Sequence, residues 1–248
     1  MSEGILFVAG TGPGTSDYMA PAARAAIASA TYICGYKPYL EQVSHLIPPG
    51  AQVFSNGMTG EKERVEKAIE AMEQGNRVAL VCGGDASLYS LASLVHELAT
   101  NTDAIEVIPG ITAALAASAR LGAPVADDLA IISMSDLLTP WELIRKRVEA
   151  VNSGDFVCAI YNPRSKKRTT QLAHTVERFM TERGDLACGY VRHCYREGES
   201  TWTGHLSALD LEVIDMSTVV MVGSTRTRLK NGKLVTPRGY TAKYGERP

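Results

Sequence analysis

Short apolar runs alternate with segments of helical spacing through the first half of the chain. The apolar runs predict strands at 5–9, 32–34, 52–54, 78–82 and 106–108. The segments between and after them predict helices around 22–30, 38–45, 62–74, 88–99 and 111–121. Regular alternation of strand and helix is typical of a parallel sheet with crossover helices, so an α/β fold is expected.

A second series of elements follows Gly122-Ala123-Pro124, which ends a helix because glycine suits the C-terminal cap and proline cannot continue the helix. The pattern predicts helices at 140–151 and 169–183, and strands at 129–133, 155–161, 187–192, 200–203, 211–214 and 217–222. Little helix separates the last strands, so the second sheet is expected to be mixed. We therefore predict two α/β domains, 1–124 and 125–248.

Composition narrows the class of protein without defining a function. The chain of 248 residues is 45% hydrophobic and 21% charged with a net charge of -2, which gives no general attraction to nucleic acid or to a membrane. Its five cysteines form no C-x-x-C pair and lie mostly in apolar runs, so no metal site is predicted. No targeting segment or membrane-length apolar stretch is recognised, and a cytoplasmic location is expected.

Four predicted strand ends carry loops suited to binding a ligand. They are Gly10-Thr11-Gly12-Pro13-Gly14, Gly83-Gly84-Asp85, Pro109-Gly110-Ile111-Thr112-Ala113-Ala114 and Tyr161-Asn162-Pro163. Glycine allows close backbone approach, and the first N–H groups of a helix and the Thr112 hydroxyl are expected to donate to a ligand. Ligands of open α/β sheets bind at the carboxyl ends of strands, so one shared site is predicted.

Each of these features also has a structural interpretation. The Gly10 loop lacks the third glycine of a dinucleotide fingerprint and the Gly-Lys-Ser/Thr of a P-loop, and can be a tight turn. Asp85 can contact a ligand or cap a helix beginning near Ala86. The basic run 164–168 can be a solvated loop, touch RNA phosphates or pair with a small polyanion, and the scarcity of aromatic residues favours the polyanion. His193 can be structural or transfer a proton.

Taken together, the motifs resemble the tetrapyrrole methylase family. The Gly10, Gly83 and Pro109 loops match three family blocks in their usual order. Further blocks resemble its precorrin-3B C(17)-methyltransferase branch and span nearly the whole chain: Gly35 to Tyr39, Ser133 to Trp141, Tyr161 to Arg168, Arg196 to Glu199 and Thr236 to Tyr240. The family commonly has proline after the aspartate of the second block, where this chain has Ala86.

The resemblance implies two α/β domains, a mostly parallel sheet followed by a mixed one, with an active cleft between the domains, and a homodimer. It implies S-adenosylmethionine as cofactor, contacted by Pro13, Gly83, Gly84, Asp85, Leu88, Thr112, Ala113, Tyr161 and Asn162. Candidates for substrate binding are Gly12, Gly14, Lys37, Arg164 and Arg192. Candidates for proton transfer are Asp85, Asp136, His193 and Tyr36, and the sequence does not choose among them.

The implied reaction is methylation of position 17 of precorrin-3B with ring contraction to precorrin-4, in cobalamin biosynthesis, leaving S-adenosylhomocysteine. The same reaction on cobalt-precorrin-3, and methylation of another precorrin position, are open alternatives. A nucleic-acid-binding module using residues 164–168 and a dinucleotide-dependent oxidoreductase are rivals from other classes. The expected partner is a tetrapyrrole substrate, with transient hand-over to neighbouring pathway enzymes. Binding to nucleic acid or to a membrane is not expected.

Overall fold

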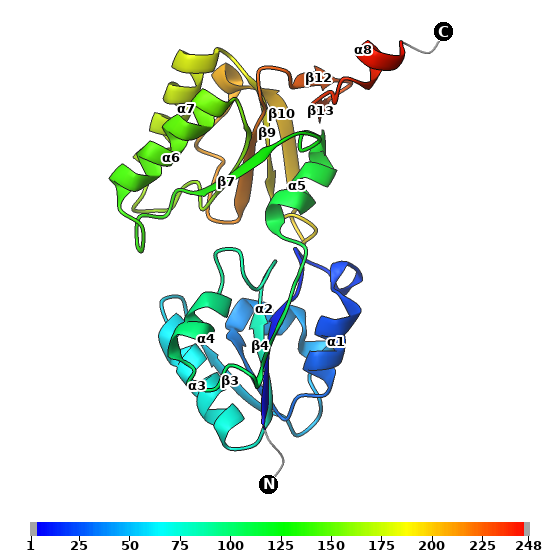
Figure 1. The fold of residues 1–248 in the computed structure, drawn as a ribbon, viewed down its shortest axis with the longest axis vertical. Helices are drawn as coiled ribbons and strands as arrows, with labels where there is room; N and C mark the ends of the chain where they lie inside the picture. The colour runs from blue at the N-terminus through cyan, green and yellow to red at the C-terminus, as the bar shows by residue number, and fades with distance from the viewer. Residues whose placement is uncertain (1–3, 246–248) are drawn as a thin grey trace. The chain divides into compact units, whose positions relative to one another are not determined.

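The computed structural model describes residues 4–245, which divide into two compact units after Ala113. Each unit contains its own five-stranded sheet with helices against it (Figure 1). The helix α5 (Ala113–Leu121) and the short strand β6 (Gly122–Ala123) make most of their contacts within the second unit. A functional domain boundary after residue 124 stays a prediction.

The N-terminal sheet is entirely parallel. Its strands are β1 (Ile5–Gly10), β2 (Tyr32–Tyr36), β3 (Gln52–Asn56), β4 (Arg77–Cys82) and β5 (Ile105–Ile108). They are arranged in the order β3-β2-β4-β1-β5. The central strands β1 and β4 are buried almost throughout, as expected when helices cover both faces of a sheet. The five strands predicted for this half are confirmed.

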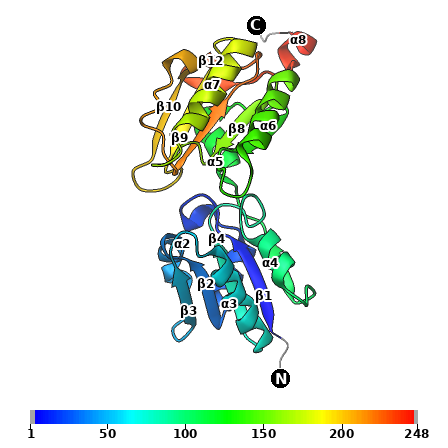
Figure 2. The same cartoon turned by 90° about the vertical axis from the view of Figure 1, so that its left-hand side faces the viewer.

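Helices cover both faces of this sheet. One face packs against α1 (Pro21–Ala28) and α2 (Lys37–Gln42), the other against α3 (Glu61–Glu73) and α4 (Ala92–Leu98), as Figures 1 and 2 show. Both α1 and α2 have proline in their first turn, where the missing N–H costs nothing. The predicted helix 88–99 begins only at Ala92, because the Asp85 side chain organises a turn before it.

The C-terminal sheet is mixed, as predicted. It contains β7 (Leu129–Ser133), β8 (Val157–Tyr161), β9 (Ala187–Arg192), β10 (Ser200–His205) and β11 (Thr218–Val222), in the order β10-β9-β11-β8-β7. Strands β7 and β8 are parallel, while β11 is antiparallel to β8 and to β9. It follows that β7, β8 and β9 run in one direction and that their carboxyl ends share one edge of the sheet.

The helices α6 (Trp141–Gly154) and α7 (Thr170–Arg183) cover one face of this sheet, where Ile144, Val148 and Phe179 enter the core. Three short pieces were not predicted, β12 (Arg228–Lys230), β13 (Lys233–Val235) and β6, which form a small sheet. Gly122 has a φ of +132°, and a Cβ there would lie 2.6 Å from the Leu234 carbonyl oxygen. The remaining pieces are the 3-10 turns Ser16–Tyr18, Ser44–Leu46 and Leu206–Ala208, and α8 (Tyr240–Tyr244).

The prediction of a strand at 211–214 is wrong. Ile214 and Leu211 pack against the core while Val213 is exposed, so the short apolar run that suggested a strand holds only two core-facing residues, three positions apart. The backbone instead turns: the Ile214 N–H donates to the Leu211 carbonyl at 3.4 Å, and the Glu212 N–H donates to the Asp210 carboxylate at 2.9 Å.

The cysteines behave as small apolar residues. All five are buried and unpaired in disulfides, and burial raises the pKa of the thiols, to about 12 for Cys34 and Cys158. Within the described residues, no helix is both long enough and apolar enough to span a bilayer.

Candidate functional site

At the carboxyl edge of the N-terminal sheet, the loops after β1 and β4 are joined through their backbones. The Gly12 N–H donates to the Gly84 carbonyl at 3.0 Å, and the Gly84 N–H donates back to the Gly12 carbonyl at 2.8 Å. Both glycines have positive φ, +77° and +71°, which other residues adopt only at a cost. The Thr11 hydroxyl also donates to the Cys82 carbonyl at 3.0 Å. This pairing extends the β1–β4 contact beyond the strands.

The loop after β5 is packed against the same two loops at glycine positions. A Cβ on Gly110 would clash with the Gly84 carbonyl oxygen, and a Cβ on Gly10 would lie 2.7 Å from the Gly110 nitrogen. Real Cβ atoms do not approach backbone so closely, so these positions require glycine. The three loops therefore form one unit of backbone, which we call the glycine cradle (residues 10–14, 83–85 and 109–112).

Gly84 differs from its neighbours in the cradle. A Cβ placed there would meet only the Ala113 nitrogen, at 4.0 Å. The space into which a side chain at Gly84 would point is thus open, although the backbone of this residue is fixed by two hydrogen bonds. Open space beside rigid backbone is what a ligand held through backbone groups requires, so the cradle fits the predicted cofactor.

Asp85 ties two loops of the cradle together. Its Oδ1 accepts from the Ser87 and Leu88 N–H groups at 2.9 and 3.0 Å, and its Oδ2 accepts from the Gly110 N–H at 3.0 Å. Burial acts to raise the pKa of this carboxyl, but these backbone hydrogen bonds outweigh it and the pKa is lowered. Asp85 is therefore ionised at neutral pH. It does not cap α4, which begins at Ala92.

The predicted residues after β2 lie beside the cradle. The ring of Tyr39 packs against Gly83, where a Cβ would lie 2.5 Å from it. Tyr36 contacts Tyr39 edge to face with ring centroids 5.3 Å apart, and Lys37 is exposed at the start of α2. Of the other predicted positions, the same edge also carries Pro13, Gly14, Leu88, Thr112 and Ala113.

At the carboxyl edge of the C-terminal sheet, polar side chains as well as backbone groups join the loops. Asn162, in a left-handed conformation with φ of +48°, donates from Nδ2 to the Ser133 hydroxyl at 2.9 Å. The Tyr161 hydroxyl accepts the Ala114 N–H at 2.7 Å, in the first turn of α5. The expectation that the first helical N–H groups there are unengaged is thus wrong for Ala114.

Arg168 is a structural residue that sequence reasoning missed. Only 7% of it is exposed, and it donates from one terminal nitrogen to the Asn162 carbonyl at 2.6 Å and contacts the Met216 sulfur at 3.4 Å. Asp136 lies 4.0 Å away, and the Nε atom has no hydrogen-bond partner among the described residues. Burial lowers the pKa of this guanidinium. Its position in a basic run concealed this, because such runs are usually solvated.

The remaining candidates share this edge but are engaged with neighbours. One terminal nitrogen of Arg164 donates to both carboxylate oxygens of Glu212, at 2.7 and 2.8 Å. Arg192 pairs with Asp215 at 2.7 Å, and the backbone N–H of His193 donates to the Ser217 carbonyl at 3.0 Å. Asp136 accepts from Gln171 at 2.9 Å. Within the basic run this leaves Lys166 and Lys167 exposed, and the roles predicted for these residues stay predictions.

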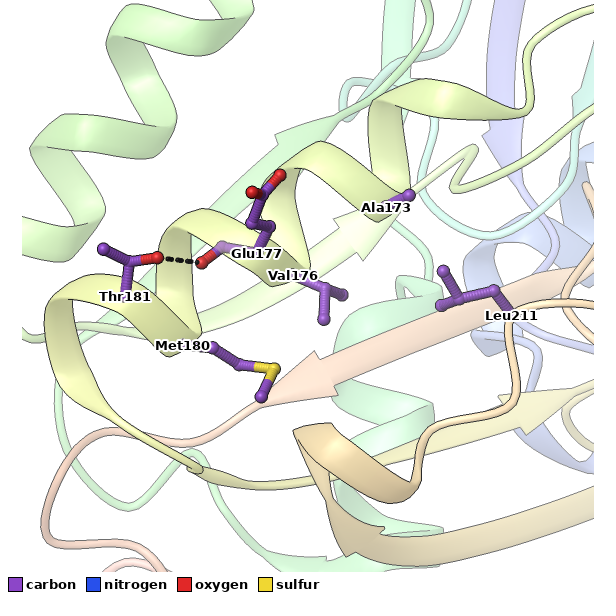
Figure 3. A pocket seen from close by; sticks show the side chains of 6 residues that line it. All are labelled: Ala173, Val176, Glu177, Met180, Thr181 and Leu211. Atoms are coloured by element: carbon purple, nitrogen blue, oxygen red, sulfur yellow. Dashed lines mark hydrogen bonds between the residues drawn. The ribbon is translucent and has the colours of Figure 1, made fainter.

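A surface pocket of about 440 Å³ lies along α7 (Figure 3). Its lining is mostly apolar and consists of Ala173, Val176, Glu177, Met180, Thr181 and Leu211. The Thr181 hydroxyl is already bonded to the Glu177 carbonyl at 2.9 Å. With one carboxylate and no converging polar groups, this pocket offers no evident chemistry.

The fold and the glycine cradle define an α/β ligand-binding protein with a parallel sheet in its first unit and a mixed sheet in its second. The family model of the Tetrapyrrole (Corrin/Porphyrin) Methylases matches residues 6–210. The chain belongs to this family.

Individual members of the family that are similar to this chain are named as methyltransferases or as proteins of cobalamin biosynthesis. A protein of Salmonella typhimurium named probable cobalt-factor III C(17)-methyltransferase is 39% identical over 96% of this chain and its own whole length. The cobalamin biosynthesis protein CbiHC of Archaeoglobus fulgidus is 43% identical over 98% of this chain, which spans about half of that relative (54%). Among solved structures, the methyltransferase CobJ is 35% identical with a TM-score of 0.87, covering 94% of this chain and 100% of its own.

Proposed function

We propose that this chain is an S-adenosylmethionine-dependent methyltransferase that methylates position 17 of precorrin-3B, with ring contraction to precorrin-4, in cobalamin biosynthesis. The observation that carries the proposal is similarity over the full length of a relative named for C(17) methyl transfer. The likeness to CobJ at 35% identity supports it.

The glycine cradle is proposed to hold the cofactor. Pro13, Gly83, Gly84, Asp85, Leu88, Thr112 and Ala113 would surround it, with the open side of Gly84 giving it room. We propose that Tyr161 and Asn162 contribute further contacts from the second unit. The cofactor supplies an activated methyl group, so the chain's own residues mainly align the reactants and exclude water.

The substrate would be a carboxylated macrocycle, and exposed cations suit its periphery. Lys37 lies at the edge that carries the cradle, whereas Gly12 and Gly14 would contact the substrate through backbone. Arg164 and Arg192 would exchange their present carboxylate partners, Glu212 and Asp215, for those of the substrate.

Among the proton-transfer candidates, the contacts favour some over others. Both oxygens of Asp85 accept backbone N–H groups, which supports a positioning role. Asp136 is held by Gln171, and His193 has a left-handed backbone with φ of +49°. Tyr36 stands beside Tyr39 at the cradle. Asp136, His193 and Tyr36 therefore stay the candidates for assisting ring contraction.

The cobalt-containing analogue, in the anaerobic route, is the second candidate substrate. Relatives from Salmonella typhimurium and Methanocaldococcus jannaschii are both named for cobalt-factor III. Here cobalt belongs to the substrate rather than to the protein. Comparing turnover of the metal-free and cobalt forms under anaerobic conditions would decide between them.

A homodimer, a cytoplasmic location and transient hand-over to neighbouring pathway enzymes are further parts of the proposal. Sedimentation velocity measures the first of these. A dimer is the expected result, and a monomer at all accessible concentrations would contradict it.

The reaction itself is tested with methyl-labelled S-adenosylmethionine and each tetrapyrrole. The expected product carries one new label and has a contracted ring, as determined by mass spectrometry and absorbance. An unlabelled product, or none from either substrate while a control methyltransferase is active, would contradict the proposal.

A further inference from the structure

The loop between β7 and α6 covers residues 134–140 (Figure 1). It contains two adjacent leucines that the described structure leaves in solvent. Leu137 is 81% exposed and Leu138 is 98% exposed. Single exposed apolar residues are common, but a pair at the tip of one loop is an apolar surface without a partner. The loop belongs to the block Ser133 to Trp141, to which the proposed cofactor site gives no role.

Contacts at both ends of this loop hold its tip in a defined position. Met134 is completely buried, and its N–H donates to the Tyr161 carbonyl at 2.9 Å. The Asp136 carboxylate accepts from Gln171 at 2.9 Å. At the other end, Trp141 packs on the core and against His174, with ring centroids 5.7 Å apart.

The anchoring also places the loop beside the residues predicted to bind ligand. Ser133 pairs with Tyr161 across the β7–β8 ladder and accepts the hydrogen bond from Asn162. Asp136 lies 4.0 Å from Arg168, whose neighbour Lys167 is exposed. An apolar tip and exposed cations are thus carried on adjacent loops at one edge of the sheet.

We propose that residues 136–139 form a substrate-binding loop in which Leu137 and Leu138 contact the apolar face of a tetrapyrrole ring. Lys166 and Lys167, on the neighbouring loop, pair with its peripheral carboxylates. A flat apolar ring with an anionic rim matches this combination of leucines and lysines. The inference rests on the proposed function, because it takes the tetrapyrrole as the ligand.

The test uses the double variant Leu137→Ser/Leu138→Ser, with Val213→Ser as control. Val213 is also exposed, at 42%, but lies in the turn after Asp210. A carboxylated porphyrin is titrated into each protein, and binding is followed by quenching of tryptophan fluorescence. Trp141, at the end of the loop, is one of two tryptophans in the chain.

The double variant is expected to bind the porphyrin about tenfold more weakly or worse, since two leucines lose their apolar contacts. Its KM for the tetrapyrrole should rise in parallel, while its affinity for S-adenosylhomocysteine, its melting temperature and its sedimentation stay unchanged. Val213→Ser should match the wild type throughout. Equal porphyrin affinity in the double variant would overturn the inference, as would a weakened affinity that accompanies dissociation of a dimer.

The two proposals fail in different ways. A wild-type protein that does not bind S-adenosylhomocysteine refutes the proposed methyltransferase, whatever the porphyrin titration gives. A wild type that binds S-adenosylhomocysteine and transfers methyl groups, with the double variant unaffected, refutes only the role of the loop.

Discussion

The two sheet edges bring their loops together by different means. At the N-terminal edge, glycines let three stretches of backbone touch, and the Asp85 carboxylate ties two of them. At the C-terminal edge, backbone bonds are supplemented by longer polar side chains, namely Asn162, Arg164, Arg168 and Arg192. The first edge should therefore tolerate almost no added atom, whereas the second should respond to lost hydrogen bonds in a graded way.

The largest expected effect is that of Gly110→Ala. Its methyl group would clash with the Gly84 carbonyl. The Gly84 segment is held by the Gly12–Gly84 pair and the Gly110 segment by the bond from its N–H to Asp85, so relieving the clash would disrupt one of these ties. We expect a loss of about 3 kcal/mol or more in the free energy of unfolding. Urea unfolding measures it, with Gly57→Ala as the control because a Cβ at Gly57 meets nothing within 4 Å. Equal stability of the two variants would contradict the close packing.

Asp85→Asn should have the next largest effect. The amide cannot accept from the backbone N–H groups at both of its heavy atoms, so about 2 kcal/mol of stability should be lost. Because the folded pKa of Asp85 is lowered, its contribution is present above an ordinary carboxyl pKa of about 4 and is lost as the pH falls further. Wild type and variant should therefore converge in stability at acid pH. A constant difference across that range would show that the charge is not responsible.

A smaller loss is expected for Asn162→Gly at the other edge. Glycine keeps the left-handed backbone and removes only the hydrogen bond to Ser133, at a cost of about 1 kcal/mol. Thermal unfolding of Asn162→Gly and Asn162→Ala separates the two contributions, because alanine adds backbone strain. If the glycine and alanine variants lost the same amount of stability, the left-handed backbone would not be the reason for asparagine at this position.

The smallest effect is predicted for Arg164→Ala. Its partner Glu212 has a side chain that is 79% exposed, and such ion pairs contribute less than about 1 kcal/mol. The difference from wild type should shrink further in high salt. A loss as large as that of Asp85→Asn would mean that the two edges do not differ as described.

Most of the fold could be predicted because buried parallel strands appear as short apolar runs, as in 78–82. The strand predicted at 211–214 failed because a turn with two core-facing apolar residues contains a short apolar run like that of a strand. The small sheet of β6, β12 and β13 could not be found, since two or three residues carry no periodicity.

The sequence identified the loops of the candidate site but not what holds them. Gly10, Gly84 and Gly110 were recognisable as a set, yet only the structure separates the two that need glycine for packing from the one that borders open space. The burial of Arg168 could not be predicted either, because its partners are the backbone carbonyl of Asn162 in its own loop and the Met216 sulfur from a distant one.

The central claim, that the glycine cradle holds the cofactor, is tested most directly by calorimetric titration with S-adenosylhomocysteine. Gly84→Ala is compared with Gly232→Ala, since both residues have φ near +70° (+71° and +72°) and a methyl group meets no atom within 4 Å at Gly232. We predict binding to wild type and Gly232→Ala alike and at least about tenfold weaker binding to Gly84→Ala. Equal affinity of a folded Gly84→Ala variant would contradict the account.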